Sequence, residues 1–277
     1  MTTIDSVHAG PALRRTSLCV PGTAPARHLK AYDLPCDEVV LDLEDAVAPE
    51  HKDDARTTVV GTLGDARWET RTVAVRVNAG DAADLEAVAA LGVPGLTIVL
   101  PKVERPEDVA AVAARLDGTG IGLQALLETP AGTAAAHEIA AAAGSVVALI
   151  LGYADLAAEL GRRGAQDDLA RWLVHQERVL GAARAAGVQA LDGPFLDLAD
   201  TAALARSARW ARELGFDGKW AIHPAQLAPI ARAFAPTAAE REEARAVEEA
   251  LASGEGAARL GGKMVDEAHR RRAARVL

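Results

Sequence analysis

An apolar run that ends in three carboxylates is the feature that most constrains this sequence. Residues 39–47 read Val-Val-Leu-Asp-Leu-Glu-Asp-Ala-Val, so Asp42, Glu44 and Asp45 follow directly on apolar side chains. Carboxylates are costly to bury unless they are paired or bind a cation. They are tolerated where a buried strand opens into a functional crevice, which in a barrel is the carboxyl end of the strands. We therefore expect these three acids at such an end; solvent exposure or helix capping is the alternative.

Short apolar runs alternate with longer helical stretches along the chain. Eight such βα units in one chain of 277 residues predict an α/β protein, a (β/α)8 TIM barrel. An open doubly wound sheet is the alternative, but no Gly-x-Gly-x-x-Gly motif follows the first expected strand. The expected strands span residues 16–20, 38–42, 72–76, 95–100, 121–127, 146–151, 188–191 and 218–222.

Two more helical stretches are expected after the eighth strand, at residues 238–252 and 262–276. They exceed what a barrel needs. We therefore predict a barrel domain over residues 1–236 and a C-terminal helical extension over residues 237–277. Because an appendage without a core of its own is suited to pack on a neighbouring subunit, we expect a homo-oligomer.

Composition narrows the classes of partner. The formal net charge is −9, and no basic run counters it, so we expect no nucleic acid partner. No apolar run is long enough to span a bilayer, and residues 1–15 lack the apolar segment of a signal peptide. Cys19 and Cys36 lie in or near apolar stretches, as core residues of a reducing compartment do. We therefore expect a cytoplasmic protein with no membrane partner.

Polar side chains gather where the expected strands end. Any one of them has a plain structural explanation: Asp155 as a helix cap, Lys102 as a surface lysine, and His223 as a satisfied loop histidine. Their recurrence at strand after strand is what favours a site, because barrel active sites lie at the carboxyl ends. The set is Arg15 beside the first strand, Asp42, Glu44, Asp45, Arg76, Asn78, Lys102, Glu128, Asp155, Asp192 and His223.

Two of these acids have the character of metal ligands. Glu128 and Asp155 follow consecutive expected strands, so we expect them to be neighbours in space. With no cysteine or histidine between them, they suit a hard cation such as Mg²⁺. The alternative is a pair of helix-cap acids. Arg76 adds a planar cation that fits a carboxylate or a developing enolate oxygen. Together these groups suit the making or breaking of a carbon–carbon bond beside a carbonyl.

Nine motifs spread over nearly the whole chain resemble the citrate lyase beta-subunit family. That family belongs to the HpcH/HpaI aldolase superfamily, which includes malyl-CoA and citramalyl-CoA lyases. The motifs, in order, are Arg15-Thr-Ser-Leu-Cys-Val-Pro-Gly22, Leu41-Asp-Leu-Glu-Asp-Ala-Val47, Arg76-Val-Asn78, Leu100-Pro-Lys-Val-Glu104, Leu127-Glu-Thr129, Gly152-x-x-Asp-Leu156, Gly215-Phe-Asp-Gly-Lys219, Ile222-His-Pro224 and Gly262-Lys-Met-Val-Asp266.

The resemblance implies a TIM-barrel, Mg²⁺-dependent carbon–carbon lyase. Its partners would be a short 3-hydroxyacyl-CoA thioester, such as malyl-CoA or citramalyl-CoA, and a 2-oxo acid. By motif, Glu128 and Asp155 would bind the metal. Arg76 would bind the substrate carboxylate or keto oxygen.

The remaining implied roles are spread over five residues. Arg15 and Lys102 would help to hold the acyl-CoA or the substrate. Asp45 would orient or activate the reacting group, and Glu44 would support the site through hydrogen bonds. Asp266 would act as acid/base in the site of an adjacent protomer, which implies a trimer or a hexamer.

Three departures from the family pattern leave the substrate open. Ala154 stands where a glutamate is common, Cys19 where a phenylalanine is common, and Glu267-Ala268 follows Asp266 where Arg-Pro or Met-Pro is frequent. Two alternatives therefore stay open: a CoA-independent 2-oxo acid aldolase, and a non-catalytic accessory subunit of a lyase complex. The intact set of Arg76, Glu128, Asp155 and Asp266 argues against the second.

Overall fold

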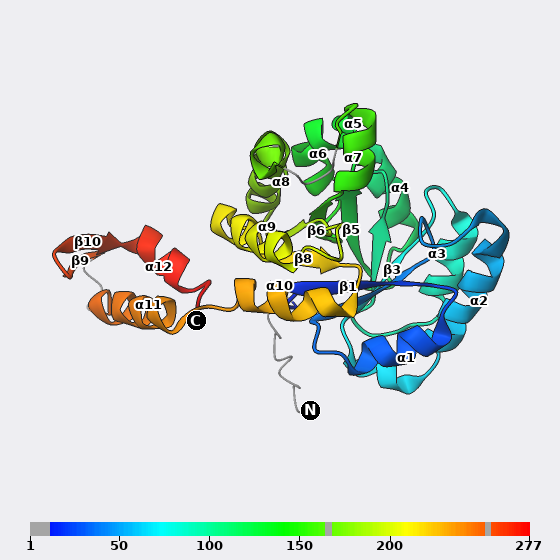
Figure 1. Ribbon diagram of the computed structural model, residues 1–277, viewed down its shortest axis with the longest axis horizontal. Coiled ribbons are helices and arrows are strands. Elements are labelled where there is room, and N and C mark those ends of the chain that lie inside the picture. Colours follow the sequence, from blue (N-terminus) through cyan, green and yellow to red (C-terminus); the bar gives the residue numbers. More distant parts are fainter. Residues whose placement is uncertain (1–11, 164–167, 253–255) are drawn as a thin grey trace, which may run out of the picture. The chain divides into compact units, whose positions relative to one another are not determined.

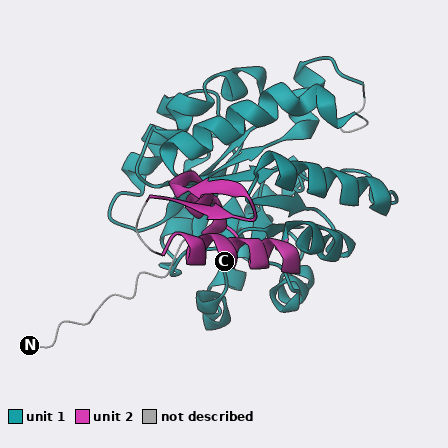
Figure 2. Ribbon diagram, turned by 90° about the vertical axis from the view of Figure 1, so that its left-hand side faces the viewer, with its two compact units in different colours: residues 1–234 teal, residues 235–277 magenta. Residues whose placement is uncertain are grey.

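The structure, a computed structural model, describes residues 12–163, 168–252 and 256–277. It divides into two compact units, residues 1–234 and 235–277, which Figure 2 shows in different colours. The division lies close to the domain boundary predicted after residue 236. The two units are described separately below.

The first unit is built on a closed parallel barrel. Its strands are hydrogen-bonded in sequence order, and β1 pairs with β8 to close the ring. This confirms the predicted (β/α)8 fold and excludes the open doubly wound sheet. The strands are β1 Thr16–Pro21, β2 Glu38–Asp42, β3 Val73–Arg76, β4 Thr97–Leu100, β5 Gly122–Leu127, β6 Val146–Leu151, β7 Gln189–Asp192 and β8 Gly218–Ala221.

Helices follow each strand and surround the barrel (Figure 1). Local signals set their ends: the Asp81 carboxylate accepts hydrogen bonds from the first turn of α3, and Gly215, at φ 114°, ends α9. The stretch expected as one helix over 131–143 forms two short helices. The helices of this unit are α1 Pro25–Asp33, α2 Lys52–Leu63, α3 Ala82–Ala89, α4 Pro106–Arg115, α5 Pro130–Ala134, α6 Ala136–Ala140, α7 Tyr153–Glu159, α8 Leu173–Ala186, α9 Thr201–Leu214 and α10 Leu227–Phe234, with 3-10 turns at Pro49–His51, Ala66–Thr70, Leu169–Trp172 and Pro224–Gln226.

Two apolar layers hold the barrel together. Alternate strand residues point inward or outward, so each strand feeds both layers. Outward residues pack under the helices in one large cluster that includes Leu41, Ile98 and Leu149. The inward residues form a smaller cluster of Val40, Ala74, Val99, Leu126, Ala148, Ile150, Leu191 and Trp220, against which Cys19 packs.

The amino end of the barrel is closed by a buried polar network. Arg14 Nε donates to Glu38 Oε1 at 2.7 Å, and Glu38 also accepts from Ser17 Oγ at 2.9 Å and Gln124 Nε2 at 2.8 Å. Such a network is tolerated in a core because most of its polar atoms are paired; Gln124 Oε1 is buried without a hydrogen-bond partner among the described residues. The amino end is therefore filled, and an open site has room only at the opposite, carboxyl end.

The second unit combines helices with a small hairpin. It contains α11 Ala238–Ala250, the antiparallel pair β9 Ala257–Leu260 and β10 Lys263–Asp266, and α12 Glu267–Ala273. The helix predicted over residues 262–276 was wrong for its first part. Gly261 and Gly262, at φ 56° and 81°, form the two-residue turn that a hairpin prefers, and the chain becomes helical only after Asp266.

This extension has a small core of its own, which the sequence analysis had not expected. Buried apolar side chains from α11, β10 and α12 pack together. They are Ala244, Val247, Leu251, Val265 and Ala273. Met264 lies on the other side of its strand and is 68% exposed, as alternation along β10 requires.

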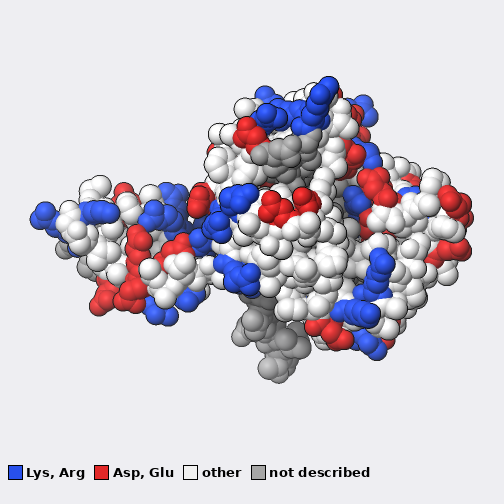
Figure 3. Space-filling model, viewed as in Figure 1, with Lys and Arg blue, Asp and Glu red and all other residues white. Residues whose placement is uncertain are grey.

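The surface carries both signs of charge. In Figure 3, Lys and Arg side chains are interspersed with Asp and Glu over the face shown. In the part of the chain that the structure describes, no helix combines the length and apolarity needed to cross a bilayer.

Candidate active site

Five consecutive strands deliver polar side chains to one end of the barrel. Asp42 and Arg76 are the last residues of β2 and β3. Lys102 lies two residues after the end of β4, and Glu128 directly follows the end of β5. Asp155 lies in the first turn of α7, after β6. Because parallel strands end at the same rim, these groups share the mouth of the barrel. The contacts below show which of them meet.

Arg76 is fixed by the acids at the end of β2. The register places it opposite Asp42, and its Nε and Nη2 donate to the two Asp42 carboxylate oxygens at 2.7 and 2.6 Å. Its Nη1 lies 3.1 Å from Glu44 Oε2. Burial alone would lower the pKa of Arg76, but the hydrogen bonds that it donates to Asp42 raise it, so the guanidinium stays charged. The two parallel hydrogen bonds to Asp42 fix the plane of the guanidinium. A lysine, with a single ammonium group, could not be fixed in this way.

Lys102 connects three acids across the mouth. Its Nζ is hydrogen-bonded to Glu44 Oε1 and lies 3.4 Å from Asp45 Oδ1 and 3.5 Å from Asp155 Oδ2. Burial raises the pKa of Glu44 against the opposing effect of Lys102 and Arg76. Burial would also raise the pKa of Asp45, but its bonds with Glu44 and Lys102 lower it overall. Asp45 is therefore ionised at neutral pH, and Glu44 is held between two cations.

The backbone of Lys102 is strained. Its φ is 52°, and it is the one non-glycine residue with positive φ in the described chain. A lysine in this conformation is uncommon and persists where the surroundings enforce it, as they often do at functional sites. Here the conformation lets the Lys102 N–H donate to Glu128 Oε1 at 2.9 Å while the side chain reaches the acids.

Glu128 is a buried carboxylate next to a second one. Burial, followed by the nearby Asp155, raises its pKa to about 8, against the lowering effect of the Lys102 N–H. Gly152 makes the space for it: a Cβ at that position would lie 2.5 Å from Glu128 Cβ and 2.7 Å from Glu128 Oε2. Gly152, directly after β6, therefore has no side chain at the place where the Glu128 carboxylate lies.

These two acids fit a divalent cation. No group of three potential metal-ligating side chains occurs in the described residues, so the protein would supply two carboxylates at most. Mg²⁺ often binds proteins in this way and keeps several waters. A cation between Glu128 and Asp155 would relieve the repulsion and burial that raise the pKa of Glu128. The donor set and the electrostatics therefore suit Mg²⁺.

Three predicted site residues lie elsewhere or have structural partners. Arg15 precedes β1, and its guanidinium makes two 3.0 Å bonds to Asp37, which precedes β2. It is thus at the amino end of the barrel, and its expected place at the carboxyl ends was wrong. Asn78 donates to Leu43 O at 3.0 Å and holds the loop after β2. His223 caps the 3-10 turn after β8, where its Nδ1 accepts from the Ala225 N–H.

Asp266 lies in the second unit, at the start of α12. Its Oδ1 accepts from the Ala268 and His269 N–H groups at 3.0 and 3.3 Å, and it is 2.8 Å from His269 Nδ1. These hydrogen bonds, above all those from His269, lower the pKa of Asp266. The carboxylate is therefore ionised at neutral pH.

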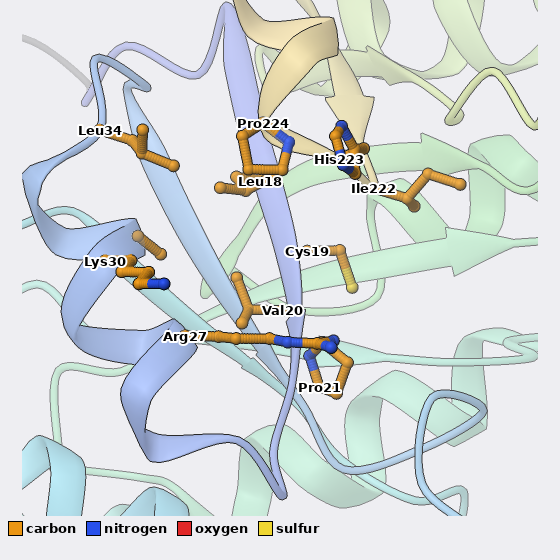
Figure 4. A pocket seen from close by; sticks show the side chains of 11 residues that line it. Leu18, Cys19, Val20, Pro21, Arg27, Lys30, Leu34, Ile222, His223 and Pro224 are labelled. Carbon is orange, nitrogen blue, oxygen red and sulfur yellow. The ribbon is translucent and has the colours of Figure 1, made fainter. Parts of the chain in front are cut away.

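A cavity of about 340 Å³ opens over β1 in the barrel unit, next to Asp42. Figure 4 shows Arg27 and Lys30 coming from α1, and His223 and Pro224 from the segment after β8. Cys19 lines it as well and contacts Asp42 on the inner side of β1. Burial and Asp42 raise the pKa of the Cys19 thiol, so it stays protonated and unreactive. The cavity is mostly apolar, with two cationic side chains.

Residues 15–224 match the family described as HpcH/HpaI aldolase/citrate lyase. The chain belongs to this family. It is 39% identical over 267 residues to a (3S)-malyl-CoA thioesterase of Cereibacter sphaeroides strain KD131, covering 92% of this chain and 90% of that protein. An L-malyl-CoA/beta-methylmalyl-CoA lyase of Rhodobacter capsulatus is 34% identical over 294 residues, covering 94% of this chain and 92% of that protein.

A solved structure agrees with these relatives in both sequence and fold. CitE of Mycobacterium tuberculosis, in complex with magnesium, acetoacetate and coenzyme A, has a TM-score of 0.77 and 35% identity. The match covers 96% of this chain and 97% of that one. The family resemblance and the prediction of an enzyme of the citrate lyase beta-subunit type are confirmed.

Sequence reasoning did not find every residue that builds this site. Asp42 was expected at the strand end, but its bidentate pairing with Arg76 depends on the register of β2 and β3. The role of Gly152 was also missed. The apolar run 146–151 followed directly by Gly152 was the available signal, because a strand-end glycine often allows a close approach.

Proposed function

We propose that this protein is a Mg²⁺-dependent carbon–carbon lyase for a short 3-hydroxyacyl-CoA thioester such as malyl-CoA or citramalyl-CoA. The observation that carries the proposal is the pairing of Glu128 with Asp155 beside the fixed guanidinium of Arg76. The names of the relatives support it, since they act on malyl-CoA or were solved with magnesium and coenzyme A. Glu128 and Asp155 would hold the cation.

The cavity over β1 supports a CoA thioester over a free 2-oxo acid. Its apolar lining suits a pantetheine arm, and the cationic Arg27 and Lys30 at α1 suit phosphate groups. Cys19 connects this cavity to Asp42, and through it to Arg76. The thioester end would thus reach the acids at the barrel mouth. A CoA-independent aldolase would have no use for such a cavity.

Cleavage removes the hydroxyl proton, breaks the C2–C3 bond and leaves an electron pair at C2, which then takes up a proton. Bound Mg²⁺ would act as a Lewis acid on substrate oxygens. Arg76, whose guanidinium is fixed by Asp42 and Glu44, would stabilise the oxygen on which charge develops. Lys102 would add positive charge for the substrate carboxylate. Asp45, ionised and close to Lys102, would orient the 3-hydroxyl group, with Glu44 holding both cations in place.

Asp266 would exchange the proton at C2 as the acid/base. Its lowered pKa keeps it ionised, which suits a proton acceptor in the condensing direction. We propose that it serves a neighbouring protomer of a homo-oligomer, a trimer or a hexamer.

Thioester hydrolysis is a second candidate. The observation that favours it is the 39% identity to a (3S)-malyl-CoA thioesterase, against 34% to the lyase. Hydrolysis needs a water molecule that attacks the thioester carbonyl, whereas carbon–carbon cleavage needs a base at the 3-hydroxyl group. The same metal and Arg76 would stabilise the developing negative charge in both reactions.

A panel of 3-hydroxyacyl-CoA thioesters tests these assignments. Each is incubated with the protein and Mg²⁺, and products are separated by chromatography. A lyase releases a 2-oxo acid or glyoxylate together with a shorter acyl-CoA. A thioesterase releases the intact hydroxy acid and free CoA thiol. Failure of every thioester, with turnover of free 2-oxo acid aldol products, would favour the CoA-independent aldolase. Absence of both turnover and Mg²⁺ binding would favour a non-catalytic subunit.

A further inference from the structure

A buried ion pair lies on the outer side of the barrel, away from the groups assigned above. Lys219 of β8 and Asp192 of β7 are neighbours in register and are 0% and 1% exposed. Lys219 Nζ lies 2.5 Å from Asp192 Oδ2 and 2.6 Å from Gly193 O. Buried charges of this kind persist only when paired and hydrogen-bonded. This ion pair has no part in the proposed chemistry. Its role is therefore inferred from the side chains that it contacts.

The third member of this cluster is Tyr153. Its hydroxyl donates to Asp192 Oδ1 and accepts from Gln176 Nε2 at 2.8 Å. Gln176 Oε1 in turn accepts from Trp210 Nε1 at 3.0 Å, which extends the network to α9. The Tyr153 ring packs edge-on against Trp172, with ring centroids 5.2 Å apart. The side chain is therefore fixed by β7, β8, α8 and α9 together.

Tyr153 is also the first residue of α7, the helix that begins at the mouth. It follows Gly152, whose missing Cβ admits Glu128, and it precedes Asp155 by two residues in the same turn. A helix of this length has few contacts of its own, so its first turn takes its position from anchored side chains. The placement of that turn sets how far the Asp155 carboxylate lies from the Glu128 carboxylate.

We propose that Tyr153 is a positioning residue for the cation site, with its hydroxyl hydrogen-bonded to Asp192 and Gln176 and with Asp192 in turn paired to Lys219. The hydroxyl fixes the start of α7 and so the geometry of the Glu128–Asp155 pair. This inference rests on the proposed function, because it takes these two acids as the ligands of Mg²⁺. A purely structural anchor would affect stability but not the affinity for the cation.

Tyr153→Phe tests this with the smallest change available. It keeps the ring against Trp172 and removes only the hydroxyl. The chain has two tyrosines, and the other, Tyr32, lies on α1 with its hydroxyl 3.4 Å from Thr70 Oγ1, so Tyr32→Phe is a matched control. Mg²⁺ affinity is measured by titration calorimetry, and folding by circular dichroism and thermal melting. We expect about tenfold weaker Mg²⁺ binding in Tyr153→Phe, as for other residues that orient metal ligands, and wild-type affinity in Tyr32→Phe.

Steady-state kinetics add a second readout. At saturating Mg²⁺ the turnover number of Tyr153→Phe should return close to that of wild type, because the ligands themselves are intact. A lowered melting temperature with unchanged Mg²⁺ affinity would overturn the proposal and leave Tyr153 as a structural anchor. If wild-type protein binds no Mg²⁺, the proposed function fails, and this inference fails with it.

Fluorine NMR provides a test that does not depend on a variant's folding. Wild-type protein made with 3-fluorotyrosine should give one signal for each of its two tyrosines. Saturation with Mg²⁺ is expected to shift the Tyr153 signal and leave that of Tyr32 in place. Unchanged signals under conditions where calorimetry shows Mg²⁺ bound would contradict a connection between Tyr153 and the cation site.

Discussion

Glu128 is a carboxylate at a position where folding alone would favour a neutral side chain. Its folded pKa of about 8 lies above the ordinary value of 4.5. The protonated form is thus the one that suits the fold. The contribution of protonated Glu128 to the stability of the metal-free protein is fully present below about pH 4.5 and is lost as the pH rises toward 8. A residue retained against this penalty is a strong candidate for function.

We expect Glu128→Gln to stabilise the metal-free protein at pH 7 while it abolishes Mg²⁺ binding and activity. The gain should be on the order of 1–3 kcal/mol, because glutamine keeps the shape but has no charge to bury. Urea denaturation at several pH values measures it, and the gain should shrink toward pH 4.5. Glu50→Gln, at an exposed acid, is the control and should change little. A destabilised Glu128→Gln protein would show that the carboxylate has a favourable partner in the fold.

Arg76→Lys tests the need for a planar fork. Arginine satisfies both oxygens of Asp42 and reaches Glu44 at once, whereas lysine offers a single point charge. Because the charge opposite Asp42 is kept, we expect the fold to survive and kcat/KM to fall by about 100-fold or more. Arg56→Lys, in the Asp84 ion pair away from the mouth, is the matched control and should keep its activity. Near-normal turnover of Arg76→Lys would make Arg76 peripheral.

At the scale of elements, the junction between β6 and α7 decides whether the two acids can share a cation. Gly152 lies between the end of β6 and the start of α7 and leaves the space that Glu128 occupies. We expect Gly152→Ala to weaken Mg²⁺ binding strongly, since its methyl group would meet the Glu128 side chain at 2.5–2.7 Å. Calorimetric titration measures this. Gly61→Ala in α2, where nothing lies within 4 Å, should instead stabilise the fold by about 0.5–1 kcal/mol. Equal Mg²⁺ affinity in the two variants would argue against Glu128 as a ligand.

The elements of the barrel could be predicted because each one carries its own local signal. The run 39–41 is apolar and ends at an acid, and Asp81 caps its helix through contacts within one turn. The hairpin at 257–266 was missed because its strands are short and lie in a stretch rich in helix formers. The Gly261-Gly262 pair was the signal for it.

The site itself could be predicted only in part. Arg15 precedes the first strand, so chain direction alone places it at the amino rim, and its assignment to the carboxyl rim was wrong. The bond from Arg76 to Asp42 depends on strand register, which a single sequence does not reveal. The Tyr153–Asp192–Lys219 cluster joins residues from three elements, and no local pattern connects them. What the residues did show was the kind of group at each strand end, and so the kind of chemistry.

At the scale of the whole molecule, the question is which barrel Asp266 serves. It lies in the unit of residues 235–277, whereas the barrel acids lie in the unit of residues 1–234. The extension has a small buried core, so it can keep its shape as a separate piece. Asp266 is ionised, and its carboxylate caps the start of α12. Such a unit can complete the site of its own chain or that of another copy.

Subunit complementation separates these two arrangements. Glu128→Gln provides a folded barrel without a cation site, and Asp266→Ala a barrel without its acid/base; each alone should be inactive. If Asp266 acts in a neighbouring protomer, mixed oligomers contain sites that pair an intact barrel with an intact extension. Random assembly from equal amounts places both intact parts together in about a quarter of the sites, so about a quarter of wild-type activity should return. Subunit exchange is verified with two affinity tags. Exchange without any recovered activity would mean that Asp266 works within its own chain or takes no part in the reaction.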